Sequence, residues 1–257
     1  MIDVRKLSKR YNERTVVDDV SLTIDQGGIT VIIGPNGAGK SSFLSLMSRL
    51  SEPSAGSVSI DGLDVMMTAN GELAKHLAVL RQDNQVAVRL TVRDLVSFGR
   101  FPHSKGRLTE HDKALVTRSI GYLNLAALAD RYLDELSGGE RQRAFIAMVL
   151  CQDTRYVFLD EPLNGLDMKQ AAAMMGTIRR AADELGKTMV IVLHDINFAS
   201  AYADQIIAMR DGCVVHHGSP DAIIQADLLS DLYDTPIVIH DVGDARICTY
   251  YRAEPVL

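Results

Sequence analysis

The sequence predicts an α/β fold: a mainly parallel sheet with flanking helices, an antiparallel β subdomain and an inserted helical subdomain. The runs at 156–159 and 188–193 are almost wholly apolar, as in strands buried on both faces of a parallel sheet. Residues 2–8 and 20–25 instead alternate apolar and polar side chains, which is typical of half-buried antiparallel strands. From about residue 83 to 150, apolar residues recur at helical spacing, which predicts the helical insert.

The composition is that of one globular domain. The 257 residues are 47% hydrophobic and 23% charged, and we expect a single domain over residues 1–257. The formal net charge of −6 gives no overall attraction to nucleic acid, so no nucleic-acid partner is expected. No apolar run approaches the roughly 18–20 residues needed to cross a bilayer, and the N-terminus lacks the apolar core of a signal peptide. We expect a cytoplasmic chain unless a partner holds it at a membrane.

The first part of the chain is expected to form the β subdomain. A polar stretch at 11–15 separates its two N-terminal strands and carries the aromatic residue Tyr11. Two interpretations of Tyr11 are open, because its ring can stack on a purine base or simply cap the small sheet. Residues 57–60 predict a further strand, and Asp61-Gly62 after them is a hairpin signal.

A glycine-rich turn follows the apolar run at 31–33 and fits the phosphate-loop pattern G-x-x-x-x-G-K-[ST]. The loop consists of Gly34, Pro35, Asn36, Gly37, Ala38, Gly39, Lys40, Ser41 and Ser42. Small residues let backbone N–H groups converge on a phosphate chain, and the following helix directs its positive end at the same anion. Lys40 would reach the β- and γ-phosphates, and the Ser41 hydroxyl would bind Mg²⁺. The alternative is a chance turn, but the flanking strand and helix favour the P-loop NTPase core of a nucleotide-binding protein.

Within the insert, segments 91–99, 109–120 and 122–130 have helical spacing. Thr109 precedes an acidic first turn and predicts a helix N-cap. The stretch Phe98–His103 interrupts these helices as a loop. Its aromatic side chains are either partner contacts or loop packing, and the sequence favours neither.

A further helix is expected to begin after Ser137 and to run to about Leu150. Ser137 is a good N-cap, with Glu140 at the capping-box position. Gly138 and Gly139 are unusual, because glycine in a helix costs up to about 1 kcal/mol relative to alanine. Ordinary capping does not require them, whereas close approach of the backbone to a bound anion does.

Polar side chains follow the two buried strands. Asp160 and Glu161 end the first strand, and His194 ends the second. Ligands of parallel sheets bind at the carboxyl ends of the strands, which favours a functional role over a solvated strand exit. A long amphipathic helix is expected at 168–185 after a turn, and beyond residue 220 we assign no chemistry.

With the phosphate loop, Leu136–Glu140 and the strand ending in Asp160-Glu161 in this order, the chain resembles the ATP-binding subunits of ABC transporters. The resemblance covers residues 1 to about 220. It also matches Tyr11 to the adenine-stacking aromatic, Gln82 to the Q-loop, Asn164–Asp167 to the D-loop and His194 to the switch histidine. The chain departs from the family at Glu140, where glutamine is frequent, and at Asn164-Gly165. Neither departure is expected to abolish hydrolysis.

The resemblance implies ATP and Mg²⁺ as ligands and divides the roles among the site residues. Asp160 would hold Mg²⁺ together with Ser41, and Gln82 would sense the metal site. Glu161 would polarise the attacking water as general base, and His194 would contact the γ-phosphate. Such a division relies on positioning and electrostatics.

The resemblance also implies partners. The family's signature stretch is Leu136–Glu140, and the helical insert separates it from its own phosphate loop. The resemblance therefore implies a two-fold dimer, in which the ATP site of a second copy would be completed by Ser137, Gly138, Gly139 and Asp167. Permease subunits would dock near Gln82 and residues 92–110, with a substrate-binding protein engaged indirectly. The chain would then be peripheral, at the cytoplasmic face of the cell membrane.

Three stretches resemble the iron-siderophore, haem and vitamin B12 importers within that family. They are Val92–Val96, Phe98–His103 and His194–Asn197. Uptake of an iron-siderophore complex is the preferred interpretation. Haem or vitamin B12 import, and a non-transport ABC ATPase such as one for Fe–S assembly, are the alternatives.

Overall fold

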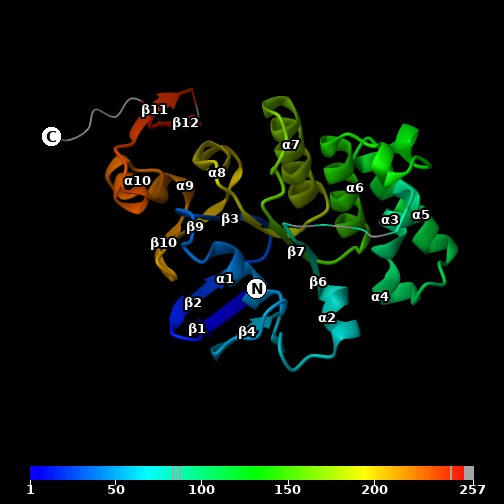
Figure 1. The fold of residues 1–257 in the computed structure, drawn as a ribbon, viewed down its shortest axis with the longest axis horizontal. Helices are drawn as coiled ribbons and strands as arrows, with labels where there is room; N and C mark the ends of the chain where they lie inside the picture. Colours follow the sequence, from blue (N-terminus) through cyan, green and yellow to red (C-terminus); the bar gives the residue numbers. More distant parts are fainter. Residues whose placement is uncertain (83, 85, 87, 244, 252–257) are drawn as a thin grey trace. The chain divides into compact units, whose positions relative to one another are not determined.

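The computed structural model describes residues 1–82, 84, 86, 88–243 and 245–251 (Figure 1). The chain divides into two compact units, Met1–Met67 with Thr188–Leu257, and Thr68–Lys187. Asp83, where the helical insert was expected to begin, lies outside the described residues. Within the described ranges, every helix is too short or too polar to span a bilayer.

The N-terminal strands of the first unit form an antiparallel sheet in the order β2-β1-β4-β5. The strands are β1 (Ile2–Tyr11), β2 (Arg14–Ile24), β4 (Ala55–Ile60) and β5 (Leu63–Asp64). The expected polar stretch at 11–15 is only a tight turn, because Tyr11 already pairs with Arg14 and Asn12 takes a left-handed φ of 53°. The antiparallel β subdomain predicted from alternation is confirmed.

The same unit holds a mainly parallel sheet around β3 (Gly28–Ile33). Strand β3 pairs in parallel with β8 (Thr188–Val192) and β9 (Gln205–Arg210), and β9 pairs antiparallel with β10 (Cys213–Gly218). All of β8 and nearly all of β3 is buried, as the apolar runs predicted. The helices that follow β3 and β8 are α1 (Lys40–Met47) and α8 (Ile196–Tyr202).

The tail beyond residue 218 folds onto this unit. It consists of α9 (Pro220–Ile223), α10 (Ala226–Tyr233) and an antiparallel hairpin of β11 (Val238–Val242) and β12 (Ala245–Thr249). Helix α10 packs against β9, and β12 packs against α8. A segment without a strong sequence pattern is therefore built into the unit that carries the phosphate loop.

The second unit combines a parallel strand pair with a group of helices. Strand β6 (Leu77–Leu80) pairs in parallel with β7 (Tyr156–Asp160), and β7 is buried at every position. The helices are α2 (Asn70–His76), α3 (Val92–Phe98), α4 (Phe101–Ser104), α5 (Glu110–Tyr122), α6 (Gly138–Cys151) and α7 (Met168–Glu184). Threonine capping boxes begin α3 and α5, which confirms both predicted helices.

Two predictions for this unit were wrong. Residues 122–130 form no α-helix: α5 ends at Tyr122, Asn124 takes a left-handed φ of 55°, and only a 3-10 turn follows at Ala126–Leu128. A residue in that conformation ends a helix whatever the apolar spacing beyond it. The stretch Phe98–His103 is also not all loop, because Pro102 lies in the first turn of α4, where its fixed φ suits a helix.

Candidate functional site

The phosphate loop joins β3 to α1 in the first unit. Gly39 is the N-cap of α1 in a left-handed conformation, and no side chain caps that helix. The ammonium group of Lys40 is buried and donates to the carbonyl oxygens of Gly34 at 2.8 Å and Pro35 at 2.9 Å. The loop therefore gathers a positive charge and the positive end of a helix dipole, which together suit an anion.

The three loop glycines serve two purposes. A Cβ on Gly34 would lie 2.0 Å from the carbonyl oxygen of Met209, and one on Gly39 would lie 2.3 Å from that of Val16. These two glycines are thus required by packing against β9 and β2. Gly37 has a φ of 81° and nothing within 4 Å of a Cβ position, so it leaves open space for a ligand.

Tyr11 lies at the end of β1 and is 53% exposed. The ammonium of Lys9 lies 4.8 Å from the centre of its ring, and its hydroxyl lies 3.4 Å from the Ser51 hydroxyl. The exposed ring remains compatible with stacking on a base, while the Ser51 contact supports the capping role. Its role in adenine binding stays a prediction.

His194 follows β8 and is exposed at the end of that strand. The next residue, Asp195, is the N-cap of α8: its carboxylate accepts from the N–H groups of Asn197 at 2.7 Å and Phe198 at 3.3 Å. The position of His194 is thus set by a buried strand on one side and a capped helix on the other.

The second unit brings Gln82 and Glu161 together, although they are 79 residues apart in sequence. The Gln82 amide donates to the Glu161 carboxylate at 2.7 Å. Glu161 has a φ of 50°, a conformation that costs a non-glycine residue roughly 1–3 kcal/mol and is frequent at functional sites. The next residue is held in place, since the Gln142 amide donates to the carbonyl oxygen of Pro162 at 3.0 Å.

Asp160 is the last residue of β7 and is only 9% exposed. Among the described residues, no three His, Cys, Asp or Glu side chains gather into a group that could hold a metal ion. Mg²⁺ is usually held by one or two carboxylates, with water and substrate phosphate oxygens completing its shell. A carboxylate at Asp160 therefore suits an ion of this kind that arrives with a nucleotide.

Ser137 begins α6 with a reciprocal capping box, as predicted. Its hydroxyl accepts from the Glu140 N–H at 3.4 Å, and the Glu140 carboxylate accepts from the N–H and O–H of Ser137 at 2.9 and 2.8 Å. These hydrogen bonds lower the pKa of Glu140. Because glutamine can close the same box, glutamate at this position preserves the helix start.

The two signature glycines differ in their surroundings. A Cβ on the buried Gly139 would lie 2.6 Å from the side-chain oxygen of Gln170, whereas nothing lies within 4 Å of such an atom on Gly138. The N–H of Gln170 donates to the Asp167 carboxylate at 2.7 Å, which caps α7. Gln170 thus connects the D-loop to the signature helix, a role that sequence reasoning missed because the residue has no local signal.

Comparison with known proteins shows the family of the chain. A sequence model described as ABC transporter matches residues 17–164. The petrobactin import ATP-binding protein YclP of Bacillus subtilis (strain 168) is 50% identical, over 98% of this chain and 100% of that protein. FatE of Bacillus anthracis, also a petrobactin import ATP-binding protein, is 47% identical over 93% and 96%. The chain belongs to the ABC transporter family.

A solved structure supports this placement. The ATP-binding cassette MJ0796, in a dimeric post-hydrolysis state with bound ADP and Pi, has a TM-score of 0.76 and 28% identity, over 86% of this chain and 99% of its own. The protein is accordingly an ABC ATPase that binds and hydrolyses ATP. Its phosphate loop fits a nucleoside triphosphate, since Gly37 leaves open space and Lys40 supplies a positive charge.

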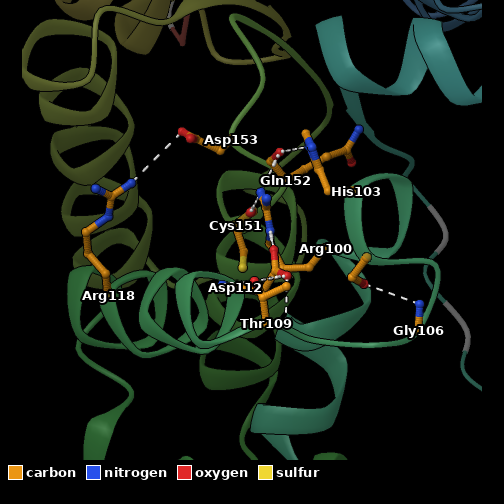
Figure 2. Close-up of polar contacts among 10 residues, drawn as sticks. Arg100, His103, Gly106, Thr109, Asp112, Arg118, Cys151, Gln152 and Asp153 are labelled. Atoms are coloured by element: carbon orange, nitrogen blue, oxygen red, sulfur yellow. Dashed lines mark hydrogen bonds and ion pairs between the residues drawn. The ribbon is translucent and has the colours of Figure 1, made fainter.

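In this ABC ATPase, the stretch Phe98–His103 has a buried anchor (Figure 2). The Arg100 guanidinium donates to the Asp112 carboxylate at 2.9 Å, and both residues are 4% exposed. It also donates to the carbonyl oxygens of Cys151 and Gln152 at the end of α6, at 3.0 and 3.1 Å. Arg100 therefore packs inside the second unit, whereas the two interpretations of the aromatic side chains, partner contacts or loop packing, both stay open.

Asp112→Asn is expected to lower the free energy of unfolding by about 3–5 kcal/mol, because it leaves a buried guanidinium without its counter-charge. Hydrogen bonds from Thr109, followed by the bond from Arg100, hold the pKa of Asp112 far below its usual value. A depressed pKa gives stability that is complete above the unfolded pKa of about 3.9 and is lost as the pH falls below it. Urea unfolding of both proteins should show the full difference at pH 7 and a shrinking one below about pH 4.

Asp94→Asn is the matched control. Asp94 closes the same kind of capping box with Thr91, but it is exposed, whereas Asp112 is buried. The control should cost about 1 kcal/mol, the usual value of a cap. Equal losses for the two variants would show that the ion pair adds nothing beyond the cap.

Proposed function

We propose that this chain is the ATP-hydrolysing subunit of an ABC importer that takes up an iron-siderophore complex across the cytoplasmic membrane. The observation that carries the proposal is the near-full-length identity of 50% and 47% to two petrobactin import ATP-binding proteins. A ferric petrobactin-type chelate is therefore the first cargo to test. The chain itself supplies the energy for transport, and the cargo is recognised by its partners.

The residues of the site divide the work of hydrolysis. The backbone of residues 34–42 would cradle the phosphates, Lys40 would balance their charge, and Tyr11 would stack on the adenine. Ser41 and Asp160 would hold Mg²⁺, with Gln82 near the ion. When bound, the metal supplies positive charge that neutralises the phosphates as the terminal bond breaks.

Glu161 is the proposed general base. Its carboxylate would orient the attacking water and accept its proton, and His194 would contact the γ-phosphate. The Gln82–Glu161 hydrogen bond of 2.7 Å supports this role, because it joins the residue proposed to sense the Mg²⁺ site to the proposed base. A left-handed backbone at Glu161 is the kind of strain that is retained at functional sites.

The proposed working unit is a homodimer in which each ATP contacts both chains. Ser137, Gly138 and Gly139 of one copy would face the γ-phosphate bound by the other, with Asp167 beside them. The open surroundings of Gly138 and the N-terminus of α6 suit an external anion. ATP binding would close this dimer and hydrolysis would open it, because the two states differ in affinity for the nucleotide. The dimeric state of the cassette MJ0796 supports the arrangement.

The proposed docking surface for the permease lies on the second unit, after Gln82 in the chain. Phe98 and Phe101 are 53% and 60% exposed beside the anchored Arg100. The same unit also has a surface pocket of about 250 Å³, whose lining combines apolar side chains with charges of both signs. It is lined by Val86, Val88, Arg89, Leu90, Leu133, Asp134 and Arg141. A cytoplasmic segment of a permease docked here would hold the chain as a peripheral subunit at the membrane, with the substrate-binding protein engaged only through the permease.

Reconstitution of the whole transporter tests this function. The chain is isolated from membranes with its bound partners, placed in proteoliposomes, and supplied with ferric petrobactin, haem or cobalamin. We expect co-isolation of a polytopic membrane protein and ATP-dependent uptake of the ferric siderophore. If only haem or only cobalamin is taken up, that compound is the cargo in place of the ferric siderophore. Co-isolation with Fe–S assembly proteins in place of a membrane protein would overturn the transport function.

A further inference from the structure

The C-terminal segment contacts the ATP-binding unit at two functional points. The first is Tyr233, the last residue of α10. Its hydroxyl accepts a hydrogen bond of 3.1 Å from the N–H of Gly34, which lies 199 residues earlier in the chain. Burial raises the pKa of Tyr233, so the hydroxyl is neutral at physiological pH. The first residue of the phosphate loop is thus held by a helix that the predicted mechanism does not use.

The second contact lies on α8, the helix that follows His194. The Asn197 carboxamide accepts from the N–H of Cys248 at 2.7 Å and donates to its carbonyl oxygen at 3.3 Å. The Ser200 hydroxyl donates to the carbonyl oxygen of Arg246 at 2.8 Å. Both partners belong to β12, which packs against α8, and Cys248 is buried. The strand is therefore fixed to the helix by three hydrogen bonds and apolar packing.

These contacts lie at two places in this unit that the proposed hydrolysis uses. One is the start of the phosphate loop at Gly34, and the other is α8, the helix that follows His194. Gly34 has little freedom to shift, because a Cβ-sized gap is already filled by the Met209 carbonyl on β9. The Tyr233 hydroxyl restrains it through its N–H. Asn197 also gives its own N–H to Asp195, so the clamp on β12 continues directly to the residue after His194.

We propose that α10 and β12 form a positioning element of the ATP site. Tyr233 holds the start of the phosphate loop, and Asn197 and Ser200 hold the helix behind His194 against β12. These residues touch no reacting atom, and they act through Gly34 and His194. The proposal rests on ATP binding by the phosphate loop but not on the nature of the cargo.

The test is a separation of ATP affinity from turnover in the full chain. Tyr233→Phe keeps the ring and removes the hydroxyl, so the Kd for ATP should rise about 3- to 10-fold, as the loss of one hydrogen bond predicts, while kcat stays within about twofold. Asn197→Leu keeps the side-chain volume and removes the clamp, so kcat should fall about tenfold or more with the Kd for ATP unchanged. Asn197→Asp still accepts from Cys248 and should recover part of the lost turnover.

Tyr251→Phe is the matched control, because it removes a hydroxyl from a tyrosine of the same tail that is 79% exposed. It should behave as the wild type. An unchanged Kd in Tyr233→Phe, or an unchanged kcat in folded Asn197→Leu, would overturn the corresponding half of the proposal. If Asn197→Leu does not fold, Ser200→Ala gives the same test, and full turnover there would count against the clamp. All these measurements use the isolated chain, so a failed transport assay would leave them intact.

Discussion

Glu161→Gln is expected to lower ATP turnover by about 10²- to 10⁴-fold, the usual contribution of a general base, while ATP binding is retained. Glutamine has nearly the same shape and can still accept the hydrogen bond from Gln82. It cannot take a proton from water, so only the chemical step should suffer. Equilibrium binding of ATP and single-turnover hydrolysis would measure the two effects separately.

Glu140→Gln provides the control for this experiment. It makes the same chemical change in the same unit, at a residue whose carboxylate caps α6 through Ser137. Because glutamine also closes a capping box, turnover should stay within about twofold of the wild type. Near-normal hydrolysis in Glu161→Gln would remove Glu161 from the role of base.

Mixing two inactive chains should restore activity if each ATP site is shared between copies. Lys40→Ala disables the phosphate loop, and Ser137→Arg blocks the signature helix, so each homodimer has two defective sites. In a heterodimer, both defects fall in one shared site and the other site is intact. We expect up to about half of the wild-type turnover if the two sites act independently.

The two chains carry different affinity tags, and tandem purification isolates the heterodimer before ATPase measurement. If each chain instead formed its whole site alone, every site would carry a defect and no activity would return. A verified heterodimer that remains inactive would therefore contradict the sharing of sites. A dimer of two Lys40→Ala chains that carry the two different tags, purified in the same way, controls for contaminating ATPase.

Local patterns predicted a large part of this protein. The G-x-x-x-x-G-K-S spacing placed the phosphate loop between β3 and α1, and Ser137 with Glu140 placed the start of α6. Both follow from backbone geometry and capping within a few residues. The same reasoning failed at 122–130, where apolar spacing continued beyond a helix that Asn124 ends.

Local sequence patterns did not predict the contacts between segments that are distant in the sequence. Arg100 lies in the aromatic stretch Phe98–His103, yet its burial against Asp112 depends on how α5 and α6 pack. Gln170 filled the space that Gly139 leaves open, and Tyr233 reached Gly34 from a tail with no assigned chemistry. The residues that neighbour Arg100, Gln170 and Tyr233 in the sequence give no pattern from which their contacts could be predicted.

The sequence by itself determined that this protein binds a nucleotide, where its phosphate loop lies and which carboxylates follow its buried strand. Those features depend on the backbone sterics and hydrogen bonds of residues that are adjacent in the sequence. Only the tertiary structure decided that Gly34 and Gly39 are needed for packing, that Gln82 meets Glu161, and that the tail supports the loop. These depend on side chains that meet across long separations, where the packing of whole elements decides which groups come within hydrogen-bond distance.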